Sequence, residues 1–296
     1  MTTETITAHA VTADTAASDQ RKGEVLLLLL TVIWGTTFIT TRTALNNITP
    51  FMLLGLRFSI GLAVLGVVFF RRLLRITRRE VWAGSVLGLV FFLGNALQTS
   101  GLKYTSASVS GFLTALSVVI VPGIAFFVLR ERLRVGALVG VVLATIGLAL
   151  LSLTDQLTIG YGDLLTVGCA VAFAFHIVYV TKYAAQAEPV GMVIVQLAIA
   201  AVLSFACAAL TEPIQPLNME TLFPAFYLGI MATAVAFVGQ VYGQRKTTAT
   251  RAALIYTMEP VFAAFFAYLV AGEMIGPRGL VGCIFILAGM LIAELT

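Results

Sequence analysis

The sequence has little charge, little histidine and few cysteines. Asp, Glu, Lys and Arg make up 11% of the 296 residues, whereas soluble domains carry about 25%. The only histidines, His9 and His176, form no H-E-x-x-H zinc motif, and no cluster of Ser, His and an acid is evident. The three cysteines lie in apolar segments, where they behave as small apolar residues rather than disulfide partners or metal ligands. These absences exclude an ordinary soluble domain, argue against an enzyme and predict no cofactor.

Long apolar stretches fill most of the chain. Apolar residues make up 59% of it, and its mean hydropathy is +1.01. A hydrocarbon core of about 30 Å needs roughly 20 mostly apolar residues per helix. We therefore predict an all-α integral membrane protein. Ten segments have this length: residues 24–44, 50–70, 81–100, 105–129, 134–153, 162–184, 190–210, 221–243, 251–271 and 277–295.

The basic residues gather in alternate loops rather than in a patch suited to nucleic acid. With a cytoplasmic amino terminus, thirteen Lys and Arg residues fall in cytoplasmic segments, and only Arg42, Lys103 and Arg278 fall outside. This bias predicts that both termini are cytoplasmic. Residues 1–23 lack the basic start and cleavage pattern of a signal peptide, and we expect them to form a disordered cytoplasmic tail.

The second half of the chain repeats the first at a nearly constant spacing. Equivalent residues in the earlier part of each half are separated by one constant number of positions, which we call the early offset. It carries Trp34 onto Phe173 and Arg57 onto Gln196. Equivalent residues in the later part of each half are separated by a slightly larger constant number of positions, which we call the late offset. It carries Gln98 onto Gln240. The late offset also carries Glu131 onto Glu273 and Gly147 onto Gly289.

The predicted repeats cover residues 24–153 and 154–296, with five spans each. Because five is odd, the two repeats cross the membrane in opposite directions. This inverted arrangement is typical of alternating-access transporters.

Polar and aromatic side chains recur at helical spacing on six of the spans. Residues at i, i+4 and i+7 share one helix face, so spans 1, 3, 4, 6, 8 and 9 are predicted to line a central cavity. Spans 5 and 10 instead repeat glycines and are predicted to form a packing surface or a homodimer interface. The predicted substrate-binding residues are Trp34, Phe38, Asn95, Gln98, His176, Tyr179, Gln240, Tyr256 and Glu259.

Several of these residues have a structural interpretation beside the functional one. Glu259 lies deep in span 9, where it either serves proton coupling and amine binding or is satisfied by neighbouring hydroxyls. Arg57 is expected to hold carbonyls or reach the membrane surface rather than to pair with Glu259, because the two lie at different depths. His176 favours a hydrogen bond to a neighbouring helix over a pH switch. Gln98 and Gln240 are expected near opposite membrane faces.

Five short motifs follow one another along the chain: Ile33-Trp34-Gly35, Leu56-Arg57-Phe58, Arg130-Glu131-Arg132, Gly162-Asp163 and Met258-Glu259-Pro260. In this order they resemble the ten-span EamA group of the drug/metabolite transporter superfamily. That resemblance covers residues 24–295 and implies a basket-shaped helical bundle in the bacterial inner membrane that moves metabolites out of the cytoplasm. Within the group, the whole chain is most similar to exporters of aromatic amino acids.

These observations predict an exporter of neutral amino acids, chiefly aromatic ones, that works by alternating access. The aromatic walls would hold the side chain, and the polar residues would hold the zwitterion. A polyanionic substrate is disfavoured because Arg57 is the only basic residue available to the cavity. The alternatives are a proton-coupled multidrug exporter of lipophilic cations with Glu259 as counter-ion, a passive channel or receptor, and an intramembrane enzyme.

Overall fold

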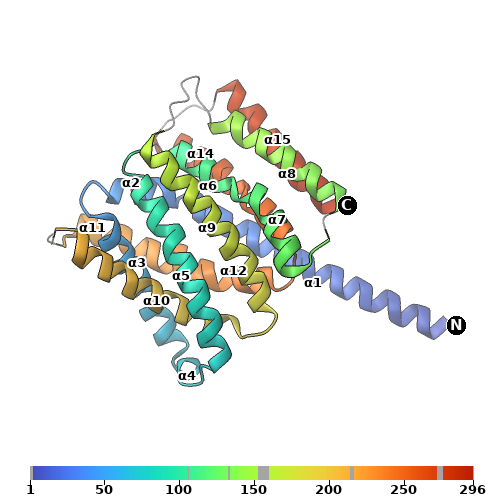
Figure 1. Ribbon diagram of the computed structural model, residues 1–296. Helices are drawn as coiled ribbons and strands as arrows, with labels where there is room; N and C mark the ends of the chain where they lie inside the picture. The colour runs from blue at the N-terminus through green and yellow to red at the C-terminus, as the bar shows by residue number, and fades with distance from the viewer. Residues whose placement is uncertain are drawn as a thin grey trace.

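The computed structural model describes residues 3–105, 107–132, 134–152, 160–213, 217–271 and 276–295. Within these residues the chain is helical, with one π-helical segment and no strand, and its helices form a bundle (Figure 1). The elements are α1 (Thr3–Gly35), α2 (Thr37–Ala44), α3 (Pro50–Val68), α4 (Phe70–Leu73), α5 (Arg78–Gly101), α6 (Ala107–Ala115), α7 (Ser117–Leu129), α8 (Val135–Ser152), α9 (Tyr161–Ala184), α10 (Pro189–Thr211), α11 (Met219–Gly229), η1 (Ile230–Val235), α12 (Ala236–Gln244), α13 (Ala249–Tyr256), α14 (Met258–Ala271) and α15 (Pro277–Leu295).

The helices follow the predicted spans, with different lengths and breaks. Seven stretches of the described chain are long and apolar enough to cross a membrane. The predicted fifth and tenth spans form shorter apolar helices, α8 and α15, and the predicted ninth span is divided at Thr257 into α13 and α14. The protein is therefore an all-helical, multi-pass membrane protein. That there are ten crossings stays a prediction.

The segment predicted as a disordered tail, residues 1–23, belongs from residue 3 onward to α1, which begins at Thr3 and continues to Gly35. No proline occurs before Pro50, and the first glycine is Gly23, so nothing in this segment stops a helix from extending beyond the apolar stretch. The α1 helix projects from the bundle at its amino-terminal end (Figure 1).

Helices α8 and α15 pack against each other through matched glycines. A Cβ on Gly140 would lie 2.5 Å from the Gly289 carbonyl oxygen, and a Cβ on Gly147 would lie 2.5 Å from the Gly282 carbonyl oxygen. The early glycine of α8 meets the late glycine of α15, so the two helices run antiparallel. The glycine-rich faces predicted to pack are thus used within one chain. A homodimer through these two helices stays a prediction.

Acidic residues at equivalent positions of the two repeats bind equivalent threonines. Thr247 Oγ1 donates to Glu24 Oε1 at 2.7 Å, and Thr105 Oγ1 donates to Asp163 Oδ1 at 2.5 Å. The early offset carries Glu24 onto Asp163, and the late offset carries Thr105 onto Thr247. The two hydrogen bonds are therefore equivalent contacts that the sequence repeat relates, although they lie at two separate places in the bundle.

Glu188 and Glu80 share Arg72 at one end of the bundle. Arg72 Nε donates to Glu188 Oε2 at 2.8 Å, Arg72 Nη2 donates to Glu80, and the backbone N–H of Gly191 donates to Glu188 at 3.0 Å. Burial alone would raise the pKa of Glu188, but the hydrogen bonds from Arg72 and Gly191 outweigh it and lower this pKa below its usual value. This cluster links α4 to the amino-terminal ends of α5 and α10.

We expect the Glu188 carboxylate to make stability depend on acid pH. Its pKa is lower in the folded state than in the unfolded chain, so its contribution is complete above the unfolded pKa and is lost as pH falls through the folded pKa. Because Glu188 is partly exposed, the contribution should not exceed about 1 kcal/mol. Thermal unfolding of the purified protein between pH 6 and pH 3, compared with Glu188→Gln, measures it. Equal pH dependence of the two proteins would contradict this prediction.

Candidate functional site

A cavity of about 90 Å³ lies in the centre of the helical bundle. We call it the central cavity. The described residues that line it are Trp34, Thr37, Phe38, Arg57, Asn95, Gln98, Gly111, Thr114, Ala115, Ser117, Phe173, His176, Ile177, Phe237, Gln240, Ala253, Tyr256, Thr257, Glu259 and Pro260.

The six spans predicted to line a cavity, 1, 3, 4, 6, 8 and 9, all contribute to this lining. Span 2 is a further contributor through Arg57. Among the described lining residues, none comes from spans 5, 7 or 10. The predicted division between cavity-lining spans and the glycine-rich spans 5 and 10 therefore agrees with the structure.

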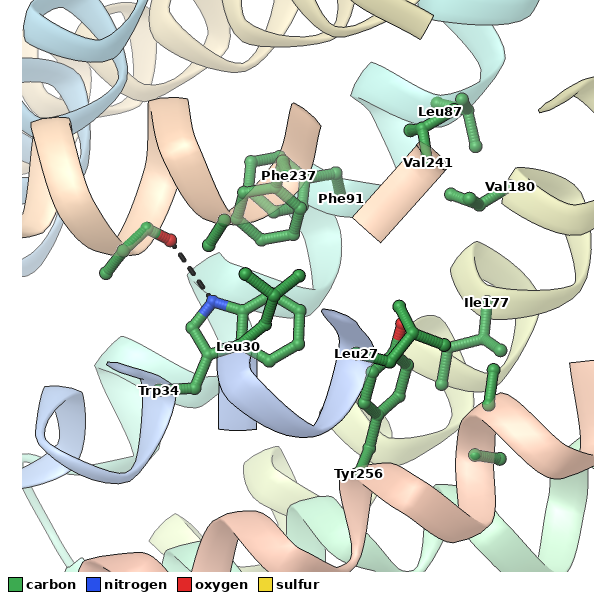
Figure 2. Packing of buried hydrophobic residues seen from close by; sticks show 14 of the residues in the cluster. Leu27, Leu30, Trp34, Leu87, Phe91, Ile177, Val180, Phe237, Val241 and Tyr256 are labelled. Carbon is green, nitrogen blue, oxygen red and sulfur yellow. Dashed lines mark hydrogen bonds between the residues drawn. The ribbon is translucent and has the colours of Figure 1, made fainter. Parts of the chain in front are cut away.

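An aromatic wall forms one side of the central cavity. The Trp34 ring lies 5.5 Å from the Phe237 ring and 5.4 Å from the Tyr256 ring, and Phe237 lies 4.5 Å from Phe91 (Figure 2). These separations are typical of favourable edge-to-face and tilted aromatic pairs. Trp34, Phe237 and Tyr256 line the cavity and come from α1, α12 and α13, so the wall joins both halves of the chain and offers an apolar surface to a ligand. Phe91 of α5 packs against Phe237 and lies outside the described lining.

The π-helical segment η1 anchors two side chains of the cavity. Trp34 Nε1 donates to the Ala232 carbonyl oxygen at 3.2 Å (dashed in Figure 2), and Arg57 Nη2 donates to the same oxygen at 3.4 Å. Arg57 Nε also donates to Thr233 Oγ1 at 2.7 Å. A π-helix departs from the regular i to i+4 pattern and often occurs at functional sites. Arg57 is therefore held by a neighbouring helix at the cavity rather than extended to the membrane surface.

Glu259 faces the central cavity without a hydrogen-bond donor from the described chain. It lies in the first turn of α14, where the positive end of the helix dipole favours a carboxylate. Its side chain is only partly exposed. Arg57 forms no direct ion pair with it within the described residues but interacts with it electrostatically. The expectation that Arg57 holds carbonyls rather than pairs directly with Glu259 agrees with the structure, although both residues line the same cavity.

The remaining polar residues of the lining are partly satisfied by protein groups. Asn95 Nδ2 donates to the Phe91 carbonyl oxygen at 2.9 Å, and Gln98 Nε2 donates to Thr114 Oγ1 at 3.1 Å. His176 Nε2 lies 3.3 Å from Gln196 Oε1, which fits its structural interpretation. These bonds leave the side-chain oxygens of Asn95 and Gln98 to face a ligand.

Gln240 contributes a buried acceptor to the cavity. Its Oε1 atom has no hydrogen-bond partner among the described residues. A buried acceptor without a partner is costly unless a ligand or water supplies a donor. Gln98 lines the same cavity. The two glutamines therefore belong to one shared site, and their position near opposite membrane faces stays a prediction.

Tyr179 does not belong to the described lining, although the sequence predicts it as a substrate-binding residue. Its ring lies 6.0 Å from Phe175 and 6.1 Å from Tyr183, on another side of α9. The other eight predicted residues line the cavity, and whether they bind substrate stays a prediction. Those eight are Trp34, Phe38, Asn95, Gln98, His176, Gln240, Tyr256 and Glu259.

Several lining residues that the sequence prediction omitted are the counterparts, in the other repeat, of residues that it included. The early and late offsets convert nearly every lining residue into another lining residue, so the cavity lies where the two repeats meet. Applying these offsets to the predicted residues would have identified several that were missed. The pairs are Trp34 with Phe173, Thr37 with His176, Phe38 with Ile177, Asn95 with Phe237, Gln98 with Gln240, Gly111 with Ala253, Thr114 with Tyr256, Ala115 with Thr257 and Ser117 with Glu259.

The two charged residues break this symmetry. The counterpart of Arg57 is Gln196, which does not belong to the described lining, and the counterpart of Glu259 is the uncharged Ser117. One repeat therefore supplies the positive charge of the cavity and the other supplies the negative charge. A ligand with both charges would bind in a single orientation.

Comparisons with known proteins agree with a transport protein. The EamA-like transporter family matches the chain twice, over residues 21–153 and 160–295. An uncharacterized transporter of Archaeoglobus fulgidus is 31% identical over 91% of this chain and 84% of its own length. A crystal structure with 22% sequence identity has a TM-score of 0.78 and covers 93% of this chain and 97% of its own, which supports the fold.

Two further relatives have more specific names. A protein of Salmonella typhimurium called a probable amino-acid metabolite efflux pump is 27% identical, over 92% of this chain and 94% of its own length. An S-adenosylmethionine/S-adenosylhomocysteine transporter of Chlamydia muridarum is 25% identical, over 85% of each chain.

Proposed function

The chain belongs to the EamA-like transporter family of the drug/metabolite transporter superfamily, and we propose that it exports neutral amino acids, chiefly aromatic ones, through the central cavity. Its family consists of transporters rather than enzymes. The proposal includes a location in the bacterial inner membrane and cytoplasmic termini, which the distribution of basic residues supports.

The observation that carries this proposal is the pair of opposite charges beside an aromatic wall. Arg57 provides guanidinium N–H donors for a carboxylate, and Glu259 provides a carboxylate for an ammonium group. The unpartnered Gln240 Oε1 is a second acceptor for the ammonium group. The aromatic wall of Trp34, Phe237 and Tyr256 offers an apolar surface for the side chain of the substrate.

The names of the relatives support the same chemistry. One is called an amino-acid metabolite efflux pump, and the other carries S-adenosylmethionine and S-adenosylhomocysteine, which are amino-acid derivatives with an α-amino and an α-carboxylate group. A site for these two groups would suit both kinds of substrate. The similarity of the whole sequence to the aromatic amino acid exporter YddG supports aromatic side chains in particular.

Alternating access between two inverted repeats is the proposed mechanism. Ten crossings, five in each repeat, would place the central cavity on the axis that relates the repeats, and the paired lining residues support this arrangement. The antiparallel packing of α8 against α15 supports the inversion. Exchange of the conformations of the two repeats would open the cavity to one side of the membrane and then to the other.

A multidrug exporter of lipophilic cations is the second candidate. Glu259 in a cavity with Trp34 and Tyr256 favours it, because carboxylates and aromatic faces both attract organic cations. Arg57 in the same cavity disfavours it, because a second positive charge would be repelled.

Counterflow into proteoliposomes distinguishes these candidates. Vesicles loaded with unlabelled phenylalanine should take up labelled phenylalanine, and external competitors should block the uptake according to their charged groups. We expect phenylalanine to compete at least about tenfold better than phenethylamine, which lacks the carboxylate, or phenylpropionate, which lacks the ammonium group. Stronger competition by phenethylamine or tetraphenylphosphonium would favour the cation exporter. No uptake of any neutral amino acid would overturn the proposed function.

A further inference from the structure

A second cavity, of about 160 Å³, lies between α1, α13 and α15, away from the central cavity. We call it the basic groove. Helix α13 contacts both α1 and α15 and so lies between them. The groove shares no described lining residue with the central cavity. Its lining residues are Arg21, Glu24, Val25, Leu28, Arg251, Leu254, Ile255, Met290 and Ala293.

The groove lies at the end of the bundle that carries many basic residues. Arg21 lies near the point where α1 enters the bundle, and Arg251 lies in the first turn of α13. Glu131 accepts hydrogen bonds from the backbone N–H groups of Ala249 and Thr250 at 3.2 and 3.3 Å, which places its neighbour Arg130 at this same end. Under the proposed orientation this end faces the cytoplasmic leaflet.

Charge at the mouth of the groove is positive. Glu24 is the only acidic residue of the described lining, and it is buried and already accepts hydrogen bonds from Gln20, Thr247 and Arg251. Arg21 is exposed and forms no ion pair with any part of the chain that the structure describes. Arg251 forms an ion pair with Glu24 at 3.3 Å, so the exposed Arg21 supplies the net positive charge of the described lining, which fits a single anionic group.

The rest of the groove is apolar. Leu28 of α1, Leu254 and Ile255 of α13, and Met290 of α15 continue from the arginines along the helices. A soluble anion would use only the charged mouth, whereas a molecule with an anionic head and a hydrocarbon chain would use the whole groove. Basic pockets between membrane helices at the cytoplasmic side are suited to anionic lipid headgroups.

We propose that the basic groove binds one anionic phospholipid. Its phosphate would lie between Arg21 and Arg251, and one acyl chain would run along Leu28, Leu254 and Met290. The site is distinct from the transport cavity, so it does not depend on which substrate the protein carries. Because the lipid would contact α1, α13 and α15 together, it would also join the start of the first repeat to the end of the second.

Native mass spectrometry of the purified protein with phosphatidylglycerol or phosphatidylcholine tests this proposal. We expect one phosphatidylglycerol to be retained in preference to phosphatidylcholine and to raise the unfolding temperature. Arg21→Gln should weaken phosphatidylglycerol binding about fivefold. Lys22→Gln is the matched control, because Lys22 is adjacent and exposed but lies outside the groove and should change binding less than about twofold.

A second pair of variants tests the acyl-chain part of the groove. Ala293→Leu adds volume inside the groove and should weaken binding, whereas Leu291→Phe changes an exposed residue of the same helix outside it. Equal binding of the two lipids, or equal effects of Arg21→Gln and Lys22→Gln, would overturn the proposal. Equal stabilisation by inorganic phosphate would overturn it in favour of a site for soluble anions. A dimer whose formation abolishes lipid binding would overturn it in favour of a second copy in the groove.

Discussion

Glu259→Gln is expected to reduce counterflow of phenylalanine by at least about 30-fold, because it removes the carboxylate that faces the ammonium group and leaves Arg57 without a compensating charge. The protein should still fold, since the Glu259 carboxylate accepts no hydrogen bond from any described residue. Initial uptake rates into proteoliposomes, at equal amounts of reconstituted protein, measure the effect.

Two other variants make this result interpretable. Glu220→Gln is the matched control, because it makes the same change at an exposed residue outside the central cavity, where uptake should be unchanged. Arg57→Gln should also reduce phenylalanine uptake if the substrate is a zwitterion. If the substrate is a cation, only Glu259→Gln should reduce uptake and Arg57→Gln should increase it. Unchanged phenylalanine uptake by Glu259→Gln would contradict the proposed role of this residue.

Most of the spans that line the cavity, and eight of its described lining residues, could be predicted from the sequence because polar residues are scarce in its apolar helices. A polar or charged side chain in a membrane span has few stable environments, so Glu259, Asn95 and Gln240 indicate the cavity with little ambiguity. The repeat could also be predicted, because the offsets depend only on residue identity. These parts need no knowledge of how the helices pack.

Tyr179 shows where the pattern failed. Successive residues of an α-helix are rotated by about 100°, so Phe173, His176 and Ile177 lie on one side of α9, and Tyr179 lies to the other side of His176. The prediction centred the face on polar and tyrosine side chains and so placed it too far round the helix. The counterparts of Trp34, Thr37 and Phe38 would have selected the correct side.

The position of Arg57 could not be predicted from the sequence. Its guanidinium group is held at the cavity by the Ala232 carbonyl oxygen and by Thr233, both in the π-helical segment η1. A π-helix has no simple sequence pattern, since residues 230–235 would suit a regular helix equally well. The sequence therefore predicted that Arg57 holds carbonyls, but it could not identify the carbonyl as that of Ala232.

Gly147→Ala is expected to lower stability strongly. The added Cβ would lie 2.5 Å from the Gly282 carbonyl oxygen, a backbone atom that can move only if α8 and α15 separate. Overpacking of this kind costs about 1–3 kcal/mol. Thermal unfolding in detergent measures the effect. Gly66→Ala is the matched control, because a Cβ there has no neighbour within 4 Å, and replacing a helical glycine by alanine should stabilise by up to about 1 kcal/mol.

The contact between α8 and α15 is symmetric, so the same prediction applies to four glycines. Gly282 is the counterpart of Gly140, and Gly289 is the counterpart of Gly147. Each of these four glycines would place a Cβ within 2.5 or 2.6 Å of a carbonyl oxygen on the facing helix. Alanine at any of them should therefore destabilise to a similar extent, and Gly147→Ala with Gly282→Ala should cost less than the sum of the two, because both act on one contact. Additive costs, or a single sensitive glycine, would show that α8 and α15 do not meet as equivalent helices.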